Sequence, residues 1–162
     1  MSRCADETRE SRVHTRQIET TKAVGHGPPT GPTLAASLRA RLAAARGQTR
    51  EALSIIERAG WIQAARAMPL DAYDRLLRAQ LLEQLGRDDE ALEFYAQFGE
   101  RSPYDLPFLW QVELGMARIA ERRGDRAGAA RWYRSVATRL RDADLPLKSQ
   151  AGRATTLADA LR

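Results

Sequence analysis

Apolar residues recur at helical spacing over most of the chain, and glycines interrupt the pattern at regular intervals. In the stretch LLEQLGRDDEALEFYAQF, such positions stand on both sides of Gly86. A glycine inside a helix costs about 1 kcal/mol relative to alanine, whereas at a helix end it adopts a left-handed turn without steric penalty. The acidic run that follows favours a helix N-terminus. The pattern therefore predicts two helices, one ending at Gly86 and the next capped by Asp88 or a neighbour.

The same arrangement surrounds Gly47 and Gly124, so the pattern repeats with a period of about 38 residues, which is typical of stacked helical repeats. Small residues before and after each glycine favour close approach of the two helices of a pair. Larger residues on the same stripe of the second helix are expected to fill the space against the next pair. The small residues are Ala40, Ala79 and Ala117 before the three glycines and Ala52, Ala91 and Ala129 after them. The larger residues are Ile56, Tyr95, Phe98, Tyr133 and Val136.

Proline and acidic residues separate the repeats and set their expected boundaries. The first link contains Pro69, with Asp71 as the expected cap of the following helix. The second link contains Pro103 and Pro107, with Asp105 as the expected cap. We therefore expect an all-α fold with repeats at about 33–60, 71–100 and 107–142.

A further helix is expected after Pro146. Its apolar residues form a narrow stripe and leave the remaining surface polar, as the terminal element of a repeat array requires. We therefore expect a capping helix over 146–161. The stripe consists of Leu147, Ala151, Ala154, Ala158 and Leu161.

The first 32 residues do not share the repeat. Their apolar residues are too sparse to bury a face, and the run GHGPPTGP disfavours regular structure. We expect a disordered tail over residues 1–32 and a helical repeat domain over 33–162. The tail is either a linker (or a mis-assigned start) or a regulatory or targeting arm, and its composition favours the first interpretation.

The repeat resembles the tetratricopeptide repeat (TPR), a helix-turn-helix unit of about 34 residues. The likeness is carried by the EAL segments after Gly47 and Gly86, by Tyr95 and Tyr133, and by the alanines before each glycine. The resemblance implies a right-handed α-solenoid of three repeats plus the capping helix. Similar arrays follow bacterial serine/threonine kinase or transcriptional-regulator domains, so the chain is interpreted as a detached C-terminal array of a larger signalling protein.

In such a solenoid the first helices line a concave side that binds a peptide or a helix of a partner protein. The resemblance therefore implies a non-catalytic protein-interaction scaffold. The predicted groove mixes aromatic, aliphatic, amide and charged groups, which suits a peptide better than a metabolite. Its residues are Arg41, Tyr73, Leu76, Gln80, Glu83, Gln84, Gln111, Leu114, Arg118, Glu121 and Arg122.

The residues that most often perform catalysis or hold metals are missing from the repeats. Cys4, His14 and His26 all lie in the tail, so no zinc-ligand cluster and no Ser-His or Cys-His pair is expected on an ordered scaffold. We expect no catalytic residue, no metal and no cofactor. No apolar run approaches the about 18 residues that a membrane span needs, and no secretory signal is apparent. The single cysteine favours the cytoplasm.

Charge suggests a second function. The chain carries 26 Lys and Arg against 21 Asp and Glu, and arginines are dense between Arg118 and Arg141. A basic stripe can neutralise phosphates, so the alternative is a module that binds nucleic acid or assists a transcriptional regulator. Acidic residues such as Glu121 and Asp125 interrupt the stripe, which favours a solvated face with internal salt bridges. We expect a protein or peptide partner, neither nucleic acid nor a membrane, and leave self-association open.

Overall fold

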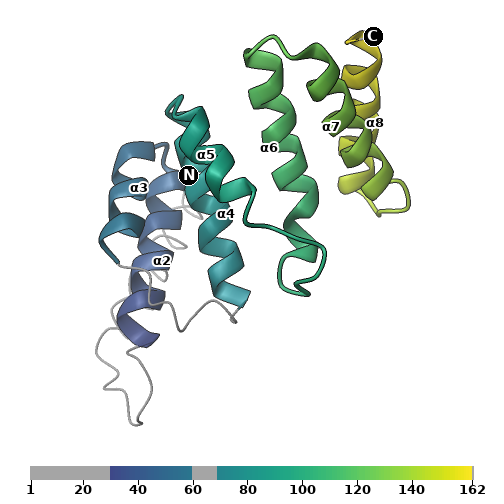
Figure 1. Cartoon of the computed structure of the whole chain (residues 1–162). Coiled ribbons are helices and arrows are strands. Elements are labelled where there is room, and N and C mark those ends of the chain that lie inside the picture. The colour runs from purple at the N-terminus through teal and green to yellow at the C-terminus, as the bar shows by residue number, and fades with distance from the viewer. Residues whose placement is uncertain (1–29, 60–68, 162) are drawn as a thin grey trace, which may run out of the picture. The chain divides into compact units, whose positions relative to one another are not determined.

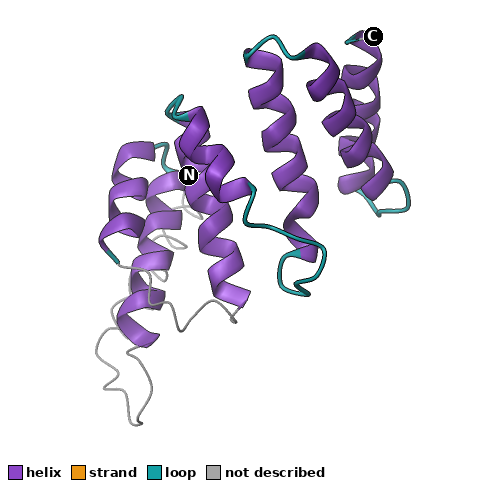
Figure 2. Cartoon of the chain, viewed as in Figure 1, coloured by secondary structure: helices purple, strands orange, loops and turns teal. Residues whose placement is uncertain are grey.

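The computed structural model describes residues 30–59 and 69–161, and the regular structure in these ranges is helical, without strands (Figures 1 and 2). This confirms the all-α class for the described residues. The chain divides into two compact units, residues 1–67 and 68–162, and each is described by itself. Most of the predicted disordered tail, residues 1–29, lies outside the described residues.

The first unit contributes one helical hairpin. Helix α2 spans Thr30–Ala45, helix α3 spans Thr49–Arg58, and the two pack against each other. Because α2 begins at Thr30, the expected tail boundary at residue 32 is too late, and Pro32 lies in the first helical turn. Proline is tolerated there because its missing N–H group has no partner within the helix. Ala40 and Ala52 are completely buried, as predicted for the small residues on either side of each repeated glycine.

The second unit contains two further hairpins and a final helix. Helix α7 packs against α6 on one side and against α8 on the other (Figure 1). The single-turn helix η2 leads directly into α6. The elements are α4 (Pro69–Gln84), α5 (Asp88–Tyr95), η2 (Leu106–Phe108), α6 (Leu109–Arg122), α7 (Arg126–Arg139) and α8 (Leu147–Ala160).

Helices α6, α7 and α8 share one apolar core. The stripe predicted for the last helix faces this core, and its three alanines are buried. Tyr133 and Val136 of α7 are buried in the same cluster, as expected for residues that fill the space against the next element. The buried members are Ala117, Ala129, Tyr133, Val136, Leu140, Ala151, Ala154 and Ala158.

The three repeated glycines end helices in the predicted way. Gly47, Gly86 and Gly124 have φ values of 74°, 73° and 77°, the left-handed region. At each, the glycine N–H donates to a carbonyl three residues back, and the next N–H donates to a carbonyl five residues back. At Gly86 these bonds measure 3.0 Å each, to the carbonyls of Glu83 and Leu82. This is the Schellman motif, which satisfies the last carbonyls of a helix.

Substituting alanine for Gly86 is expected to lower the free energy of unfolding by about 1–2 kcal/mol, because an L-residue is strained in the left-handed conformation. A Cβ atom at this position would meet nothing within 4 Å, so backbone strain alone would cause the loss. The control is Gly99→Ala, which also enters open space but at a position without a left-handed φ. Urea denaturation should show a lower midpoint for Gly86→Ala and an unchanged one for Gly99→Ala. Equal midpoints would contradict the assigned turn.

Two expected capping residues, Asp88 and Asp71, do not cap their helices, although a neighbour of Asp88, Arg87, holds the cap position of α5 without a side-chain bond. Helix α5 is preceded by Arg87, and Asp88 lies inside its first turn, where its carboxylate pairs with Arg122. Helix α4 begins at Pro69, so Asp71 also lies in a first turn and pairs with Arg75. In both first turns the carboxylate therefore pairs with a guanidinium rather than with a backbone amide of the helix end.

A third cap prediction is also wrong, and one cap was missed. Asp105 precedes η2 without capping it; its carboxylate instead accepts hydrogen bonds from the Gly99 amide at 3.2 Å and from Arg75 at 2.7 Å. Asp125, which was not expected to be a cap, caps α7 by accepting a 2.8 Å hydrogen bond from the Gly128 amide. Asp105 therefore fixes the loop between the two hairpins rather than a helix end.

Candidate interaction surface

Most of the predicted groove residues lie on α4 and α6, the first helices of the second unit's two hairpins. The Nε2 of Gln80 donates to the Oε1 of Gln111 at 3.2 Å, so these two helix faces adjoin each other. At one end of these faces, the half-exposed Tyr73 meets the ring of Phe108 edge-on, with 4.9 Å between the ring centroids. Arg41, the predicted residue of the first repeat, lies on α2 in the other unit. We define the α4–α6 surface as Tyr73, Gln80, Gln84, Gln111, Leu114, Arg118, Glu121 and Arg122.

Two predicted groove residues are buried instead. Leu76 is 4% exposed and Glu83 is 9% exposed, so neither side chain is open to a partner. Leu114, although retained in the surface, is only partly open because it packs against the apolar core of α6–α8. Helical spacing assigned these residues to the right helices but did not distinguish an open position from a covered one.

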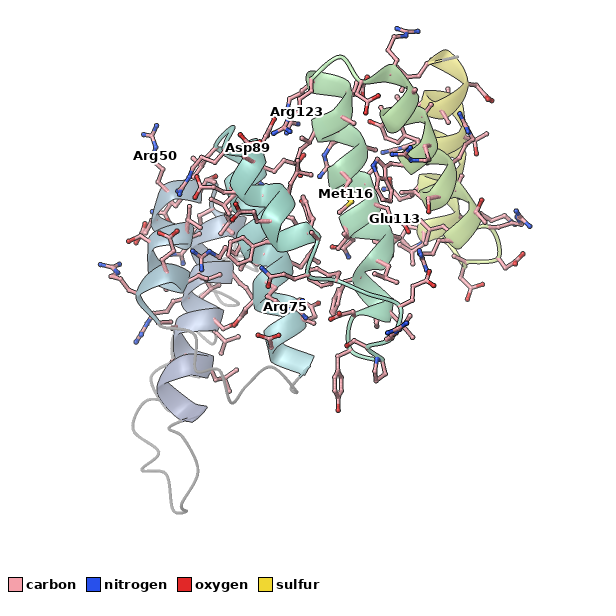
Figure 3. The ribbon with its side chains drawn as sticks, in the orientation of Figure 1. Arg50, Arg75, Asp89, Glu113, Met116 and Arg123 are labelled. Atoms are coloured by element: carbon pink, nitrogen blue, oxygen red, sulfur yellow. The ribbon has the colours of Figure 1, made fainter. Side chains whose placement is uncertain are left out.

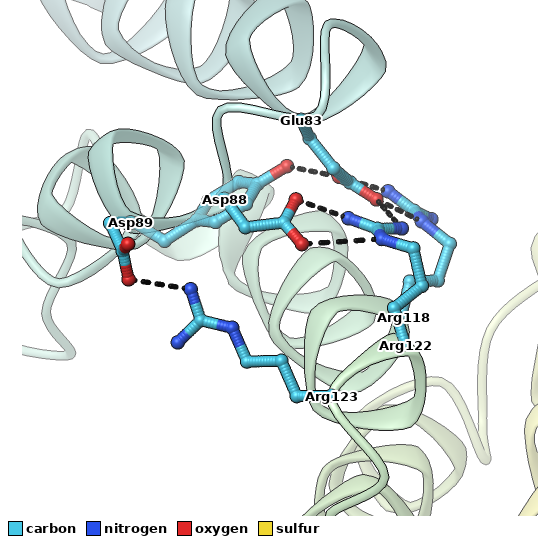
Figure 4. Close-up of polar contacts among 7 residues, drawn as sticks. Glu83, Asp88, Asp89, Arg118, Arg122 and Arg123 are labelled. Carbon is cyan, nitrogen blue, oxygen red and sulfur yellow. Dashed lines mark hydrogen bonds and ion pairs between the residues drawn. The ribbon is translucent and has the colours of Figure 1, made fainter.

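Glu83 is the centre of a polar cluster that joins the two hairpins (Figure 4). Its carboxylate accepts hydrogen bonds from the Tyr95 hydroxyl at 2.8 Å and from Nε and Nη2 of Arg118 at 2.6 and 2.7 Å. Arg122 adds a longer contact of 3.4 Å through Nη1. Four donor atoms of three residues on α5 and α6 thus converge on one carboxylate of α4, which compensates for its burial.

The electrostatics of the cluster favour a charged Glu83 beside a neutral Tyr95. Burial by itself raises the pKa of Glu83, but the hydrogen bonds from Arg118 and Tyr95 and the positive charge of Arg118 outweigh it, so the pKa lies below its ordinary value. Burial and the neighbouring carboxylate raise the pKa of Tyr95 far above its ordinary value. The phenol therefore keeps the proton that it donates to Glu83.

Two further ion pairs extend the cluster between α5 and α6. Arg122 holds Asp88 at 2.7 Å, and Arg123 holds Asp89 at 2.6 Å. Asp89 and Arg123 lie next to each other at one end of the helices (Figure 3). The acidic residues in the first turn of α5 thus form ion pairs with the arginines at the end of α6.

The glutamate–tyrosine bond recurs in the next hairpin. The Tyr133 hydroxyl donates to Glu121 at 2.7 Å, and both residues have the same offsets from Gly124 that Glu83 and Tyr95 have from Gly86. The two tyrosines were expected at equivalent positions of the repeat, but both glutamates were expected in the groove. Their equal spacing from the tyrosines was the signal that could have revealed the bond.

Arginines also fix the opposite end of the hairpin contact. Arg75 binds Asp71 at 2.8 Å, Asp105 at 2.7 Å and the Gln97 carbonyl at 3.1 Å, with its guanidinium 4.4 Å from the centroid of Phe98. The loop between α5 and η2 is therefore tied back to α4. Farther along the chain, Arg139 binds Glu113 of α6 at 2.8 Å and Glu100 of the same loop at 3.0 Å.

Most arginines of the basic stripe between residues 118 and 141 bind other residues of the chain. Arg118, Arg122, Arg123 and Arg139 are in ion pairs with residues of other elements, as the salt-bridge interpretation expected. Arg126 donates to the Ala160 carbonyl at 3.3 Å. The remaining members are exposed and make no ion pair within the described ranges; they are Arg131, Arg134 and Arg141.

In residues 30–59 and 69–161, no group of three or more His, Cys, Asp or Glu residues could hold a metal ion. No helix there has the length and apolar character to cross a membrane. Cys4, His14 and His26 lie outside the described residues.

No protein-family model, curated protein or solved structure matches the chain. Its function is therefore inferred from its own residues and their contacts.

Proposed function

We propose that this chain is a TPR-like repeat module that binds an extended peptide or a helix of a partner protein on the α4–α6 surface and catalyses no reaction. The observation that carries the proposal is the adjoining of α4 and α6 through the Gln80–Gln111 bond. The proposal includes a right-handed solenoid with α8 as its terminal cap, and a role as a detached array of a cytoplasmic signalling protein.

The repetition within the second unit supports this proposal. Hairpins α4–α5 and α6–α7 have the same left-handed glycine turn and the same buried alanine columns. Each also has the tyrosine–glutamate hydrogen bond at the same offsets. Stacking of like hairpins brings their first helices to one side, where they form an extended surface suited to a polypeptide.

The chemistry of the surface also favours a peptide. Gln80, Gln84 and Gln111 offer amide groups that both donate and accept hydrogen bonds, which matches a peptide backbone. Tyr73 adds a half-exposed ring at one end. At the other end, the guanidinium groups of Arg118 and Arg122 are already paired with carboxylates, so this end is close to neutral. A partner that depends on shape and amide contacts fits better than a strongly charged one.

Selection from a random peptide library on the intact chain tests the proposal. For a selected peptide, Gln80→Ala and Gln111→Ala are each expected to weaken binding about tenfold, since residues near the centre of an interface contribute most. The control is Gln150→Ala, a half-buried glutamine of α8 outside the surface. Fluorescence anisotropy gives the dissociation constants. Equal affinities for the three variants, or failure to select any peptide, would contradict the proposal.

In the nucleic-acid alternative, the arginines of the basic stripe that remain for phosphate contacts are Arg131, Arg134 and Arg141. Three phosphate contacts predict that log K falls with log salt with a slope of about −2.7. We expect no binding to a random DNA duplex even at about 50 mM salt. Binding with that slope, lost on replacing the three arginines with glutamine, would instead establish the alternative.

A further inference from the structure

The glutamate–tyrosine bond occurs in both hairpins of the second unit, and in the first of them an arginine completes it. Glu83 of α4 accepts hydrogen bonds from the Tyr95 hydroxyl and from Arg118, a residue of the next hairpin (Figure 4). Nε and Nη2 of Arg118 lie 2.6 and 2.7 Å from the two carboxylate oxygens, the parallel arrangement in which a guanidinium binds a carboxylate. A glutamate held by a tyrosine in this repeat therefore has room and geometry for an arginine head group.

Glu121 of α6 has the first half of this arrangement. The Tyr133 hydroxyl donates to its Oε2 at 2.7 Å, across the same 12 positions that separate Glu83 from Tyr95. Burial and the bond to Glu121 raise the pKa of Tyr133, so the phenol keeps its proton and holds the carboxylate in place. Unlike Glu83, Glu121 is exposed.

The second half, the arginine, is missing at Glu121 within the part of the chain that the structure describes. There its Oε1 accepts no hydrogen bond, and no ion pair joins it to another side chain. The arginines on either side of it in α6, Arg118 and Arg122, are paired with carboxylates of the α4–α5 hairpin. Helix α8 packs against α7, and residues 154–161 of the chain, ATTLADAL, contain neither lysine nor arginine.

The charges of the α4–α6 surface indicate which group of a partner would bind here. Glu83 and Asp88 compensate the charges of Arg118 and Arg122, whereas Glu121 has no such counterpart among the described residues. Its negative charge favours a cationic group on the partner. A guanidinium suits it better than an ammonium, because two nitrogens of its rigid fork can bind both carboxylate oxygens at once.

We propose that Glu121 binds one arginine side chain of the partner peptide, which takes at this position the part that Arg118 takes at Glu83. This inference rests on the proposed function and adds to it a required residue of the partner. Gln111 lies ten residues before Glu121 on α6, which corresponds to about 15 Å along the helix axis. In an extended peptide, at about 3.3 Å per residue, the arginine is therefore expected about four or five residues from the segment that contacts Gln111.

Peptides selected on the intact chain test the assignment once their arginine is replaced by citrulline, which has nearly the same shape but no charge. On the original protein, citrulline is expected to weaken binding about tenfold, since hydrogen bonds between charged groups contribute more than neutral ones. On Glu121→Gln, the same replacement should change the dissociation constant by less than about twofold, because the two changes remove the same interaction. Fluorescence anisotropy gives all four dissociation constants.

The matched control is Glu93→Gln, which removes one negative charge from an exposed residue of α5 outside the surface. On this variant the full loss caused by citrulline should remain. Selected peptides without a shared arginine, or an equal citrulline loss on the original protein and on Glu121→Gln, would overturn the assignment. In that case, weaker binding by Gln80→Ala and Gln111→Ala would still support the proposed function, so the two failures are distinguishable.

Discussion

Substituting alanine for Gly115 is expected to lower the free energy of unfolding by about 2 kcal/mol, as a result of overpacking. The new Cβ atom would lie 2.5 Å from Oη and 2.6 Å from Cε2 of Tyr95, inside van der Waals contact. The ring cannot retreat easily, because Tyr95 is completely buried and its hydroxyl is held by Glu83 at 2.8 Å. The preference of alanine for helices, about 1 kcal/mol, offsets only part of this cost. Urea denaturation followed by circular dichroism measures the difference.

Gly152 provides the matched control for this substitution. It also lies inside a helix, but a Cβ atom there would meet nothing within 4 Å. Gly152→Ala should therefore stabilise the protein by up to about 1 kcal/mol through helix propensity alone. The same change at two helical glycines thus has opposite expected signs. Stabilisation by both substitutions would show that the Tyr95–Gly115 contact is looser than described.

A double substitution separates the clash from other effects. Tyr95→Leu removes the ring atoms that an alanine at position 115 would meet, so Gly115→Ala should cost much less in that background. The interaction energy from the double-mutant cycle should be about 1 kcal/mol or more, as is common for residues in direct contact. Additive effects would instead place the cost of Gly115→Ala elsewhere.

The helical hairpins were predictable because their determinants are local. A glycine at a left-handed turn, alanines at the close approach of two helices and a tyrosine one helical turn later all fall within about 17 residues of one another. The stripe of α8 was predictable for the same reason, since a fixed spacing on one helix decides which side is apolar. The buried alanines and the φ values of Gly47, Gly86 and Gly124 agree with these predictions.

The partners of Asp88 and Asp105 and the burial of Glu83 were not predictable in the same way, because they depend on contacts between residues far apart in sequence. Asp88 fits the pattern of a helix cap until Arg122, 34 residues later, is placed beside it. Glu83 has the spacing of an open helix face, and only its contact with Arg118 on another hairpin shows that it is covered. Local spacing identifies the helix that carries such a residue but not its partner.

Only some of the positions predicted for the groove are open, and the reason is physical. Gln80 and Gln111 meet because the first helices of successive hairpins lie beside each other, as the repeat implied. Leu76 and Glu83 are covered instead, although their spacing along α4 is that of the same face. Residues spaced three or four apart along a helix form a stripe that includes both the open side of the helix and its covered edge. Spacing alone therefore overestimates the open surface.

Replacing Glu83 with glutamine is expected to lower the free energy of unfolding by about 2 kcal/mol at pH 7, because a buried carboxylate that accepts charge-assisted bonds is lost. Arg118 and Arg122 would then lack the carboxylate that they share, and the Tyr95 hydroxyl would keep only an amide partner. The control is Glu90→Gln, an exposed carboxylate paired with Arg87, for which we expect an unchanged urea midpoint. Equal losses for the two variants would show that Glu83 has no special role.

The effect of Glu83→Gln should also depend on pH in a defined direction. The pKa of Glu83 lies below its ordinary value of 4.5 in the folded protein, so folding favours the charged form. The resulting stabilisation is fully present above about pH 4.5 and is lost as the pH falls through the folded-state pKa, where the folded carboxylate also becomes protonated. The gap between the original protein and Glu83→Gln in urea denaturation should therefore narrow steadily below about pH 4.5. A gap that stayed constant down to about pH 3 would mean that the contacts of Glu83 stabilise the fold without regard to its charge.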